Sequence, residues 1–326
     1  MRTRKLGKSD EQISAIGLGC MGIIGWYGER DDIEARATLA RALDLGLNHF
    51  DTAEVYNGGE NEKFLAGSIK GRRQDVFLAT KCGNYRGADG PYVDNKPATI
   101  EKAIDGSLQR LGTDYIDLYY LHRIDRNVPI EESVGAMAEL VAAGKIRHVG
   151  ISEVGEETIR RANATHPIAA VQNEYSLWTR EYEGEVLDAC RELDISFVAY
   201  SPLGRGFLTG AISKEKPIAE TDSRNRHPRF QGEALDHNLL IVDKVTQIAK
   251  EKGCTPAQLA LAWAMAQGDN VMPIPGTKRR SYLEENIAAC EITFSAAELA
   301  EIDKAFPDGE TEGDRYPSAM MPALRA

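Results

Sequence analysis

Four side chains that together could move a proton follow short apolar runs in the sequence: Asp51, Tyr56, Lys81 and His122. A free tyrosine has a pKa of about 10, so it is a poor acid at neutral pH. An ammonium group within hydrogen-bonding reach favours the phenolate and lowers this pKa. We therefore predict that Lys81 makes Tyr56 a proton donor.

The other two residues fit supporting roles in the same chemistry. Asp51 would keep Lys81 charged and correctly placed, and a neutral His122 could hydrogen-bond a substrate oxygen or relay the proton. The chemistry indicated is protonation of an oxygen that gains negative charge, as in carbonyl reduction. Each residue also has a purely structural interpretation, as a rim ion pair or a core histidine. Their shared place at the ends of successive strands favours the functional interpretation.

The elements that must position these residues are alternating strands and helices. Short β-branched runs alternate with longer amphipathic segments, which is typical of βα units and a parallel sheet. The predicted strands cover residues 13–18, 48–50, 76–80, 115–121, 147–151, 169–171, 195–199 and 271–274. The predicted helices cover residues 31–45, 60–70, 99–111, 129–143, 156–164, 185–193, 239–252, 256–266, 281–289 and 296–306.

About eight strands, most of them followed by a helix, predict a closed (β/α)8 barrel in one domain spanning residues 1–326. The residues up to about Gln12 predict an N-terminal hairpin outside the repeat. Residues 82–97 hold three Gly and two Pro without periodicity and predict a loop, with a second long loop at 202–235 and an irregular tail after Pro307. The carboxyl ends of barrel strands share one face, which would bring the four side chains together.

The rival architecture is an open, doubly wound sheet that binds a dinucleotide. Gly17, Gly19 and Gly22 match the spacing Gly-x-Gly-x-x-Gly of that fold. However, no helix opens directly on this motif, and no acidic residue about 20 positions later ends a second strand. The pattern favours the barrel.

Composition limits the remaining classes. The 326 residues carry a net charge of -11, which argues against a broad nucleic-acid surface. No stretch is apolar enough to span a bilayer or to act as a leader, so we expect a cytoplasmic protein without a membrane partner. The scattered, odd set of cysteines indicates reduced thiols and no metal site: Cys20, Cys82, Cys190, Cys254 and Cys290.

Residues 51–62, Asp-Thr-Ala-x-x-Tyr followed by Asn61-Glu62, resemble the first signature of the aldo-keto reductase superfamily. Lys81 and His122 fall where that family has its Lys and His. Residues 150–153, 174–180 and 228–233 are similar to motifs of the perakine-reductase-like and auxin-induced-protein-like branch, and the resemblance covers essentially the whole chain. It implies an Asp–Tyr–Lys–His tetrad, a small-molecule carbonyl substrate, and NADPH extended across the carboxyl end of the barrel.

The resemblance also implies residues for the cofactor. Ser152 and Gln172 would bond the nicotinamide carboxamide, and Tyr200 would stack on its ring. Glu153 stands where many members have Asn, but it matches this branch. The implied cofactor set is Gly19, Cys20, Met21, Asp51, Ser152, Gln172, Tyr200, Ser201, Pro202, Leu203, Gly204, Arg205, Gly206, Gly276, Thr277, Lys278, Arg279, Glu285 and Asn286. Within it, Ser201 and residues 203–206 would line the pyrophosphate.

The basic run 275–280 lies between the last predicted strand and a helix, where backbone N–H groups and fixed cations suit a 2′-phosphate. Well-studied members have a Lys at position 276 and an Arg at 282, where this chain has Gly276 and Tyr282. We therefore expect the cation role at Lys278 with Arg279 or Arg280, and a preference for NADP. Glu285 and Asn286 match adenine-binding positions.

Two function classes follow. The first is an NADPH-dependent reductase of aldehydes or ketones, and the second is a non-catalytic NADP-binding regulatory subunit, like the channel β-subunits on this fold. The intact tetrad favours the enzyme. The sequence predicts neither the substrate nor the oligomeric state, although aromatic residues in the loops favour an aromatic-lined pocket: Tyr85, Tyr92, Phe230 and Tyr316.

Overall fold

The computed structural model describes residues 1–88, 90–214, 216–220 and 222–326. Within these residues, eight parallel strands form one sheet in the order β12-β11-β10-β9-β8-β5-β4-β3. In chain order they are β3 (Leu18–Gly19), β4 (His49–Asp51), β5 (Phe77–Cys82), β8 (Ile116–Leu121), β9 (Ile146–Ser152), β10 (Ile168–Glu174), β11 (Ser196–Tyr200) and β12 (Val271–Pro273).

Backbone hydrogen bonds join the two edges of this sheet. Gly17 N donates to Pro273 O at 2.9 Å, and Gly19 N donates to Pro275 O at 3.2 Å. A Cβ on Gly19 would stand only 2.7 Å from Ile274 O, so the close approach of the two edges requires glycine there. The sheet closes on itself, which confirms the predicted barrel.

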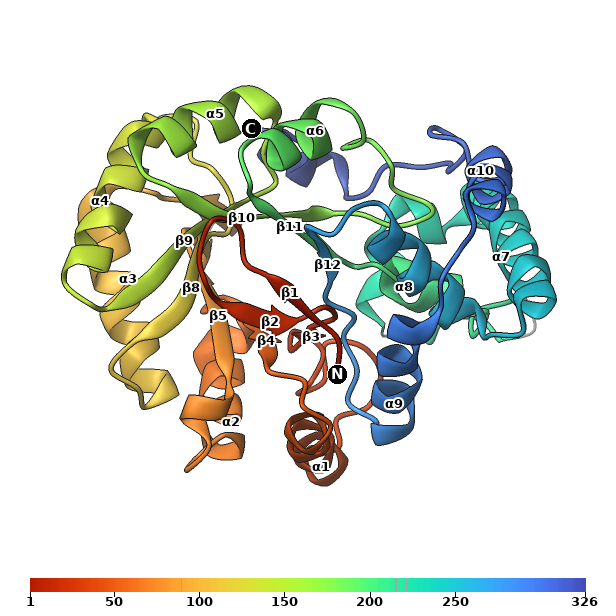
Figure 1. Cartoon of the computed structure of the whole chain (residues 1–326), viewed down its shortest axis with the longest axis horizontal. Coiled ribbons are helices and arrows are strands. Elements are labelled where there is room, and N and C mark those ends of the chain that lie inside the picture. The colour runs from red at the N-terminus through yellow and green to blue at the C-terminus, as the bar shows by residue number, and fades with distance from the viewer. Residues whose placement is uncertain (89, 215, 221) are drawn as a thin grey trace.

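Helices surround the strands (Figure 1). Their bounds are α1 (Asp32–Asp44), α2 (Glu60–Ser68), α3 (Pro97–Leu111), α4 (Ile130–Ala142), α5 (Glu156–Thr165), α6 (Glu185–Glu192), α7 (Gly232–Lys252), α8 (Pro256–Ala266), α9 (Arg280–Ala288) and α10 (Ala296–Ala305). A continuous apolar layer lies between the strands and these helices; fully buried Leu39, Ile104 and Val134 belong to it. The helix α7 begins seven positions before the predicted Leu239, at Gly232.

The first turn of α3 corrects a prediction. We predicted that this helix begins at Thr99, but it begins at Pro97 and its N-cap residue is Lys96. Proline is favoured at the first helical position because its missing N–H has no partner to lose there. The Thr99 hydroxyl instead donates to Asp94 Oδ2 at 3.0 Å.

The N-terminal hairpin closes one end of the barrel. Strands β1 (Thr3–Lys5) and β2 (Gln12–Ser14) pair antiparallel and lie across the centre of the strand ring (Figure 1). Leu6 and Ile13, both 0% exposed, pack with side chains of the barrel interior such as Leu118. The barrel interior is therefore a packed core. In such barrels the chemistry takes place at the opposite end, where the strands have their carboxyl ends.

A second hairpin replaces the loop predicted at residues 82–97. Strands β6 (Asn84–Gly87) and β7 (Gly90–Val93) pair antiparallel, with Tyr85 opposite Tyr92 and the two rings 5.3 Å apart. Such cross-strand aromatic pairs stabilise short strands that periodicity cannot detect. Asp89 lies outside the described residues, as do Glu215 and Thr221 in the second long loop. Short 3-10 helices complete the chain: η1 (Tyr56–Gly59), η2 (Arg73–Asp75), η3 (Gly204–Thr209), η4 (Ser223–Arg226), η5 (Pro228–Phe230), η6 (Ala289–Glu291) and η7 (Ser318–Ala323).

Candidate active site

The four predicted tetrad residues meet at the carboxyl ends of β4, β5 and β8. Asp51 is the last residue of β4, Lys81 is the penultimate residue of β5, and His122 follows β8 directly. Lys81 is fully buried, and its Nζ donates to Asp51 Oδ1 at 2.5 Å and to Thr52 O at 2.7 Å. The predicted ion pair therefore exists, and it lies inside the rim of the barrel.

Tyr56 reaches the same place from the turn after β4. The chain reverses there through left-handed conformations at Asn57 (φ 50°) and Gly58 (φ 63°), which Asn and Gly adopt at low cost. The half-buried Tyr56 ring meets the His122 ring edge-on, with centroids 5.7 Å apart, and Lys81 Nζ lies 5.2 Å from the Tyr56 ring centroid. The phenol, imidazole and ammonium thus face one small volume.

The direction of the pKa shift of Tyr56 differs from our expectation. Burial and the charge of Asp51 raise the pKa of Tyr56 well above its ordinary value, and the cation that opposes them is Arg123, not Lys81. Lys81 is paired with Asp51 at 2.5 Å. The phenol therefore keeps its proton, which is the form that a proton donor needs.

His122 is neutral, as predicted. Burial lowers its pKa well below the ordinary range, and the positive charges of Arg123 and Lys81 act in the same direction. Its Nδ1 is buried without a partner among the described residues. A neutral imidazole can donate one hydrogen bond to a substrate oxygen without competing with Tyr56 for the proton.

The Asp51 carboxylate is held on both oxygens. Lys81 occupies Oδ1, and Gln172 Nε2 donates to Oδ2 at 2.8 Å. Burial lowers the pKa of Lys81, and the charge of Asp51 raises it. The net pKa of Lys81 is lowered, and the support of its charge by Asp51 stays a prediction.

Several predicted cofactor positions lie at or after the ends of β9, β10 and β11. The Ser152 hydroxyl donates to Gln172 O at 2.7 Å. After β11, positive φ angles recur at Ser201 (49°), Gly204 (56°), Arg205 (58°) and Gly206 (89°). Turns of this kind can direct N–H groups toward an anion, and strained residues cluster at functional sites. Within the turn, Gly204 N donates to Ser201 O and Gly206 N to Leu203 O, and the binding of the pyrophosphate here stays a prediction.

Comparison with known proteins agrees with this geometry. The model of the Aldo/keto reductase family matches residues 15–306. The chain belongs to the aldo/keto reductase family. This confirms the predicted membership and makes the protein an oxidoreductase by family. An aldo-keto reductase of Schizosaccharomyces pombe, yakc, named for NADP(+), is 46% identical over 322 residues, covering 97% of this chain and 94% of that protein.

Two further relatives cover nearly the whole chain. The probable aldo-keto reductase 1 of Glycine max is 44% identical over 318 residues, which are 96% of this chain and 91% of the relative. Among solved structures, the glycerol dehydrogenase of Gluconobacter oxydans superposes with a TM-score of 0.85 at 27% identity. That match covers 96% of this chain and 97% of the dehydrogenase. The aldo/keto reductase fold therefore extends over the whole molecule.

The Asn61-Glu62 end of the family signature is structural. Asn61 Nδ2 donates to Cys20 O at 2.8 Å and Asn61 Oδ1 accepts from the Thr52 hydroxyl at 2.8 Å. Glu62 accepts from the Thr80 hydroxyl at 2.7 Å. These buried bonds tie α2 to the ends of β3, β4 and β5, and so fix the strand ends that carry the tetrad.

Arg205 was predicted to line the cofactor, but its side chain turns inward. The guanidinium donates to Glu174 Oε2 at 3.1 Å and its side chain is 3% exposed. The arginine fork prefers this buried carboxylate, so only the backbone of Arg205 remains for a phosphate. In the same segment of the chain, Pro202 is buried, and Tyr200 and Leu203 are half-buried.

The cations of the basic run before α9 differ in the partners that they contact. Lys278 Nζ donates to the carbonyls of Tyr27, at 2.7 Å, and Glu29, while Arg280 pairs with Glu34 at 2.9 Å. Arg279 is exposed, lies 5.7 Å from the Tyr282 ring centroid, and has no carboxylate partner among the described residues. Of the two arginine alternatives, the geometry favours Arg279.

The remaining predicted cofactor positions are dispersed along the same rim. Gly19, Cys20 and Met21 lie at the end of β3, next to residues 274–276, because Gly19 N bonds Pro275 O. Gly276 is exposed and the Thr277 hydroxyl accepts from Arg279 N at 3.1 Å. In α9, Glu285 is half-buried and Asn286 is buried, so the asparagine offers little free surface to an adenine.

Two arginines of the site were not predicted. Arg123 follows His122 and its Nη1 donates to His122 O at 2.6 Å. Arg315, in the irregular tail, donates to Glu153 at 2.9 Å and 3.1 Å, where Glu153 has a positive φ of 56°. The position of Arg123 directly after His122 could have indicated that it belongs to the site. No sequence pattern in the aperiodic tail could have indicated this for Arg315.

Of the aromatic residues expected around the substrate, only some line the rim. The Tyr316 hydroxyl lies 3.1 Å from the Tyr200 hydroxyl. Phe230 is instead 3% exposed and packs against Trp178 and Phe207 in the core. The 3-10 turn of η5 directs Phe230 inward, which the sequence pattern did not indicate.

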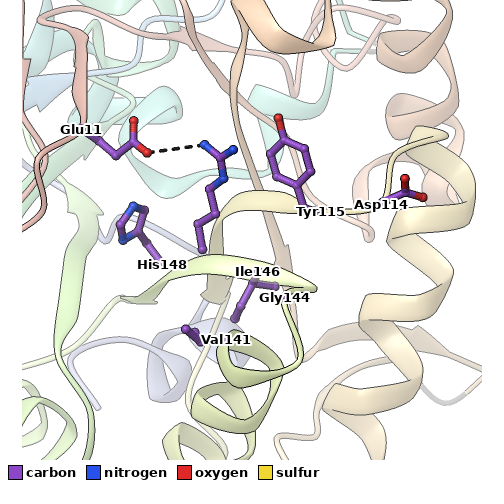
Figure 2. A pocket seen from close by; sticks show the side chains of 8 residues that line it. Glu11, Asp114, Tyr115, Val141, Gly144, Ile146 and His148 are labelled. Atoms are coloured by element: carbon purple, nitrogen blue, oxygen red, sulfur yellow. Dashed lines mark hydrogen bonds and ion pairs between the residues drawn. The ribbon is translucent and has the colours of Figure 1, made fainter.

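A surface hollow of about 600 Å³ lies at the other end of the barrel (Figure 2). Its lining comes from the N-terminal sides of β8 and β9 and from the hairpin: Glu11, Asp114, Tyr115, Val141, Gly144, Ile146, Arg147 and His148. Arg147 is already paired with Glu11 at 3.4 Å and Asp117 at 3.2 Å. Barrel enzymes carry out their chemistry at the carboxyl face, so we assign no role to this hollow.

None of the helices in the described residues is long and apolar enough to cross a membrane. No group of three or more His, Cys, Asp or Glu residues among them could hold a metal ion.

Proposed function

We propose that this protein reduces aldehyde or ketone groups of small molecules to alcohols, with NADPH as the hydride donor and Tyr56 as the proton donor. The observation that carries the proposal is the arrangement of a protonated phenol, a neutral imidazole and a buried Lys81–Asp51 pair within one small volume. Bound NADPH would supply a hydride to the carbonyl carbon.

The chain supplies the proton and the electrostatics. Tyr56 Oη would donate its proton to the carbonyl oxygen as that oxygen gains charge, and solvent would then reprotonate the phenolate. Neutral His122 would hydrogen-bond the same oxygen and orient the carbonyl. Lys81 would stabilise the transient tyrosinate with its positive charge, because its Nζ lies 5.2 Å from the centroid of the Tyr56 ring.

The choice of NADP rests on three supports. The relative from Schizosaccharomyces pombe is named for NADP(+). The positive-φ turn at residues 201–206 fits the pyrophosphate, and the exposed Arg279 fits the 2′-phosphate. Ser152 and Tyr200 stand beside the tetrad as proposed partners of the nicotinamide.

The test separates this enzyme from an NADP-binding regulatory subunit. NADPH oxidation at 340 nm is followed with 4-nitrobenzaldehyde, methylglyoxal and pyridoxal, and NADPH binding is measured in parallel by fluorescence. We expect turnover with at least one carbonyl compound. Tight NADPH binding without turnover of any of them would favour the regulatory subunit instead. The cytoplasmic location and the absence of nucleic-acid partners remain predictions.

A further inference from the structure

Arg123 lies at the carboxyl end of β8, beside the tetrad residue His122. It directly follows His122 at the end of β8 and is half-buried. The hydrogen bond of 2.6 Å from its Nη1 to His122 O holds the guanidinium against the strand end. The planar group carries five N–H donors, and this bond uses one of them.

The groups that interact electrostatically with Arg123 indicate where its positive charge lies. Burial is the largest cause of the lowered pKa of His122, and the positive charge of Arg123 is the second largest. The charge of Arg123 also lowers the pKa of Tyr56. Tyr200, Tyr316 and Glu153 act on the pKa of Arg123 in turn. The guanidinium therefore lies between the tetrad on one side and the tail side of the rim on the other.

Three arginines after the strand ends have carboxylate partners. Arg205 pairs with Glu174 at 3.1 Å, Arg224 with Asp222 at 2.8 Å, and Arg315 with Glu153 at 2.9 Å.

Arg123 differs from them. Among the residues that the structure describes, no carboxylate lies within 4.0 Å of its guanidinium, and the only hydrogen bond of its side chain there is the one to His122 O. A half-buried guanidinium of this kind retains donors for a planar anion, which it can bind through two parallel bonds.

We propose that Arg123 binds a carboxylate of the substrate, close to the carbonyl group that Tyr56 protonates. The preferred substrates are then aldehydes or ketones that carry a carboxylate near the reacting carbon. This inference rests on the proposed reductase function. The phosphates of the cofactor are assigned to the backbone of 201–206 and to Arg279, on other elements, which leaves Arg123 for the substrate.

The test compares 2-, 3- and 4-carboxybenzaldehyde with their carboxamides, which have nearly the same shape without the charge. The readout is the ratio of kcat/KM for each acid to that for its amide, measured by NADPH oxidation. We expect the wild-type ratio to be about tenfold or more for at least one isomer, because charge-assisted bonds discriminate by this order. Arg123→Gln should reduce the ratio to about one.

Two further variants separate the charge of Arg123 from its planar shape and provide a control. Arg123→Lys keeps the charge but loses the planar fork, so its ratio should be intermediate. Arg86→Gln removes a charge from the exposed β6–β7 hairpin, where Arg86 lies 5.2 Å from the Trp26 ring centroid, and should keep the wild-type ratio. NADPH affinity measured for each variant shows that the barrel is folded.

The outcomes distinguish the two proposals. Turnover of the amides with a wild-type ratio near one for all isomers would overturn the role of Arg123 and leave the reductase intact. An Arg123→Gln variant that slows acid and amide equally would also overturn it, since that result fits a residue that only keeps His122 neutral. Absence of turnover with every aldehyde by the wild-type protein would overturn both proposals.

Discussion

At the barrel rim, the charge of the fully buried Lys81 is balanced by Asp51, and this balance changes how Tyr56 works. Breaking a buried pair costs several kcal/mol, so the pair is fixed in place before any substrate arrives. Burial and the charge of Asp51 raise the pKa of Tyr56 and keep the phenol protonated. The lysine then acts on the tyrosinate that forms during reaction, not on the resting phenol.

The sequence predicted these residues because each one ends or follows an apolar run, and strand ends of a parallel barrel share one face. It predicted the wrong direction for the pKa shift of Tyr56, which depends on burial, on the charge of Asp51 and on Arg123. Residue type alone also misplaced the side chain of Arg205, since the partner Glu174 is 31 positions away in the chain. The cofactor positions came from resemblance and stay predictions.

The cations before α9 give a prediction at this scale. Arg279→Ala should raise the KM for NADPH about tenfold and leave the KM for NADH within about twofold, because only NADPH carries a 2′-phosphate. The double variant Lys278→Ala with Arg279→Ala should raise it further. Arg280→Ala is the control, since Arg280 is occupied by Glu34. Steady-state kinetics with both cofactors measure the effect, and an equal rise in both KM values would contradict the assignment.

Glu54 gives a pH-dependent prediction. Burial raises its pKa to about 7, although Tyr85 and Arg110 oppose the shift. The folded protein then binds a proton that the unfolded chain has released, so this contribution to stability is present below about pH 4.5 and is lost as the pH rises through about 7. Glu54→Gln should match the wild type at pH 5 and exceed it by about 1–2 kcal/mol at pH 8.

Urea denaturation at the two pH values measures this difference. Arg110 keeps its hydrogen bond to Glu62 in the variant, so the replacement of Glu54 leaves Arg110 with a charged partner. A variant that is less stable than the wild type at pH 8, and equal to it at pH 5, would show that Glu54 is ionised and stabilising in the fold.

At the scale of elements, the strands and helices were largely predictable, whereas the loops that shape the rim were not. Hydrophobic periodicity located most βα units within a few residues, but α7 begins seven positions early and the predicted strand 13–18 is divided between β2 and β3. It could not detect the β6–β7 hairpin, whose strands are four residues long and partly exposed. It also gave no information on the C-terminal tail, where the buried Arg315 pairs with Glu153.

Arg315 carries a prediction about this attachment. Its side chain is 3% exposed and pairs with the buried Glu153 at 2.9 Å and with Glu181 at 2.5 Å. Arg315→Met should cost about 3–5 kcal/mol because it leaves the Glu153 charge buried without its partner. Adding Glu153→Gln should recover part of that loss.

Chemical denaturation of the single and double variants measures both effects. Arg161→Met is the matched control, because Arg161 pairs with Glu131 at the exposed surface and such pairs contribute less than about 1 kcal/mol. Equal costs at Arg315 and Arg161 would mean that burial of the tail ion pair has no energetic consequence.

At the scale of the whole molecule, the count of alternating elements predicted the barrel, and the edge-to-edge bonds at Gly17 and Gly19 close it. The hairpin fills the N-terminal end, so stability and chemistry are separated between the two faces. The sequence located this hairpin but could not reveal that Leu6 and Ile13 enter the barrel interior, because packing of this kind joins residues far apart in the chain.

Ile13→Ala tests that separation, together with our proposal that residues 1–326 unfold as one domain. Removing a fully buried isoleucine should cost about 2–5 kcal/mol, while kcat should change less than about twofold. Ile33→Ala, at a side chain that is 86% exposed, should cost less than about 0.5 kcal/mol. Two separate unfolding transitions in calorimetry, or a large loss of kcat in Ile13→Ala, would contradict this view.

The most direct test of the central claim is the turnover of Tyr56→Phe beside its NADPH affinity. If Tyr56 donates the proton, kcat should fall by about 100-fold or more, since general acid catalysis contributes this order of acceleration. The Kd for NADPH should stay within about twofold, because the cofactor is assigned to other elements. A variant that keeps wild-type kcat, or that loses NADPH binding in proportion to its activity, would contradict the account.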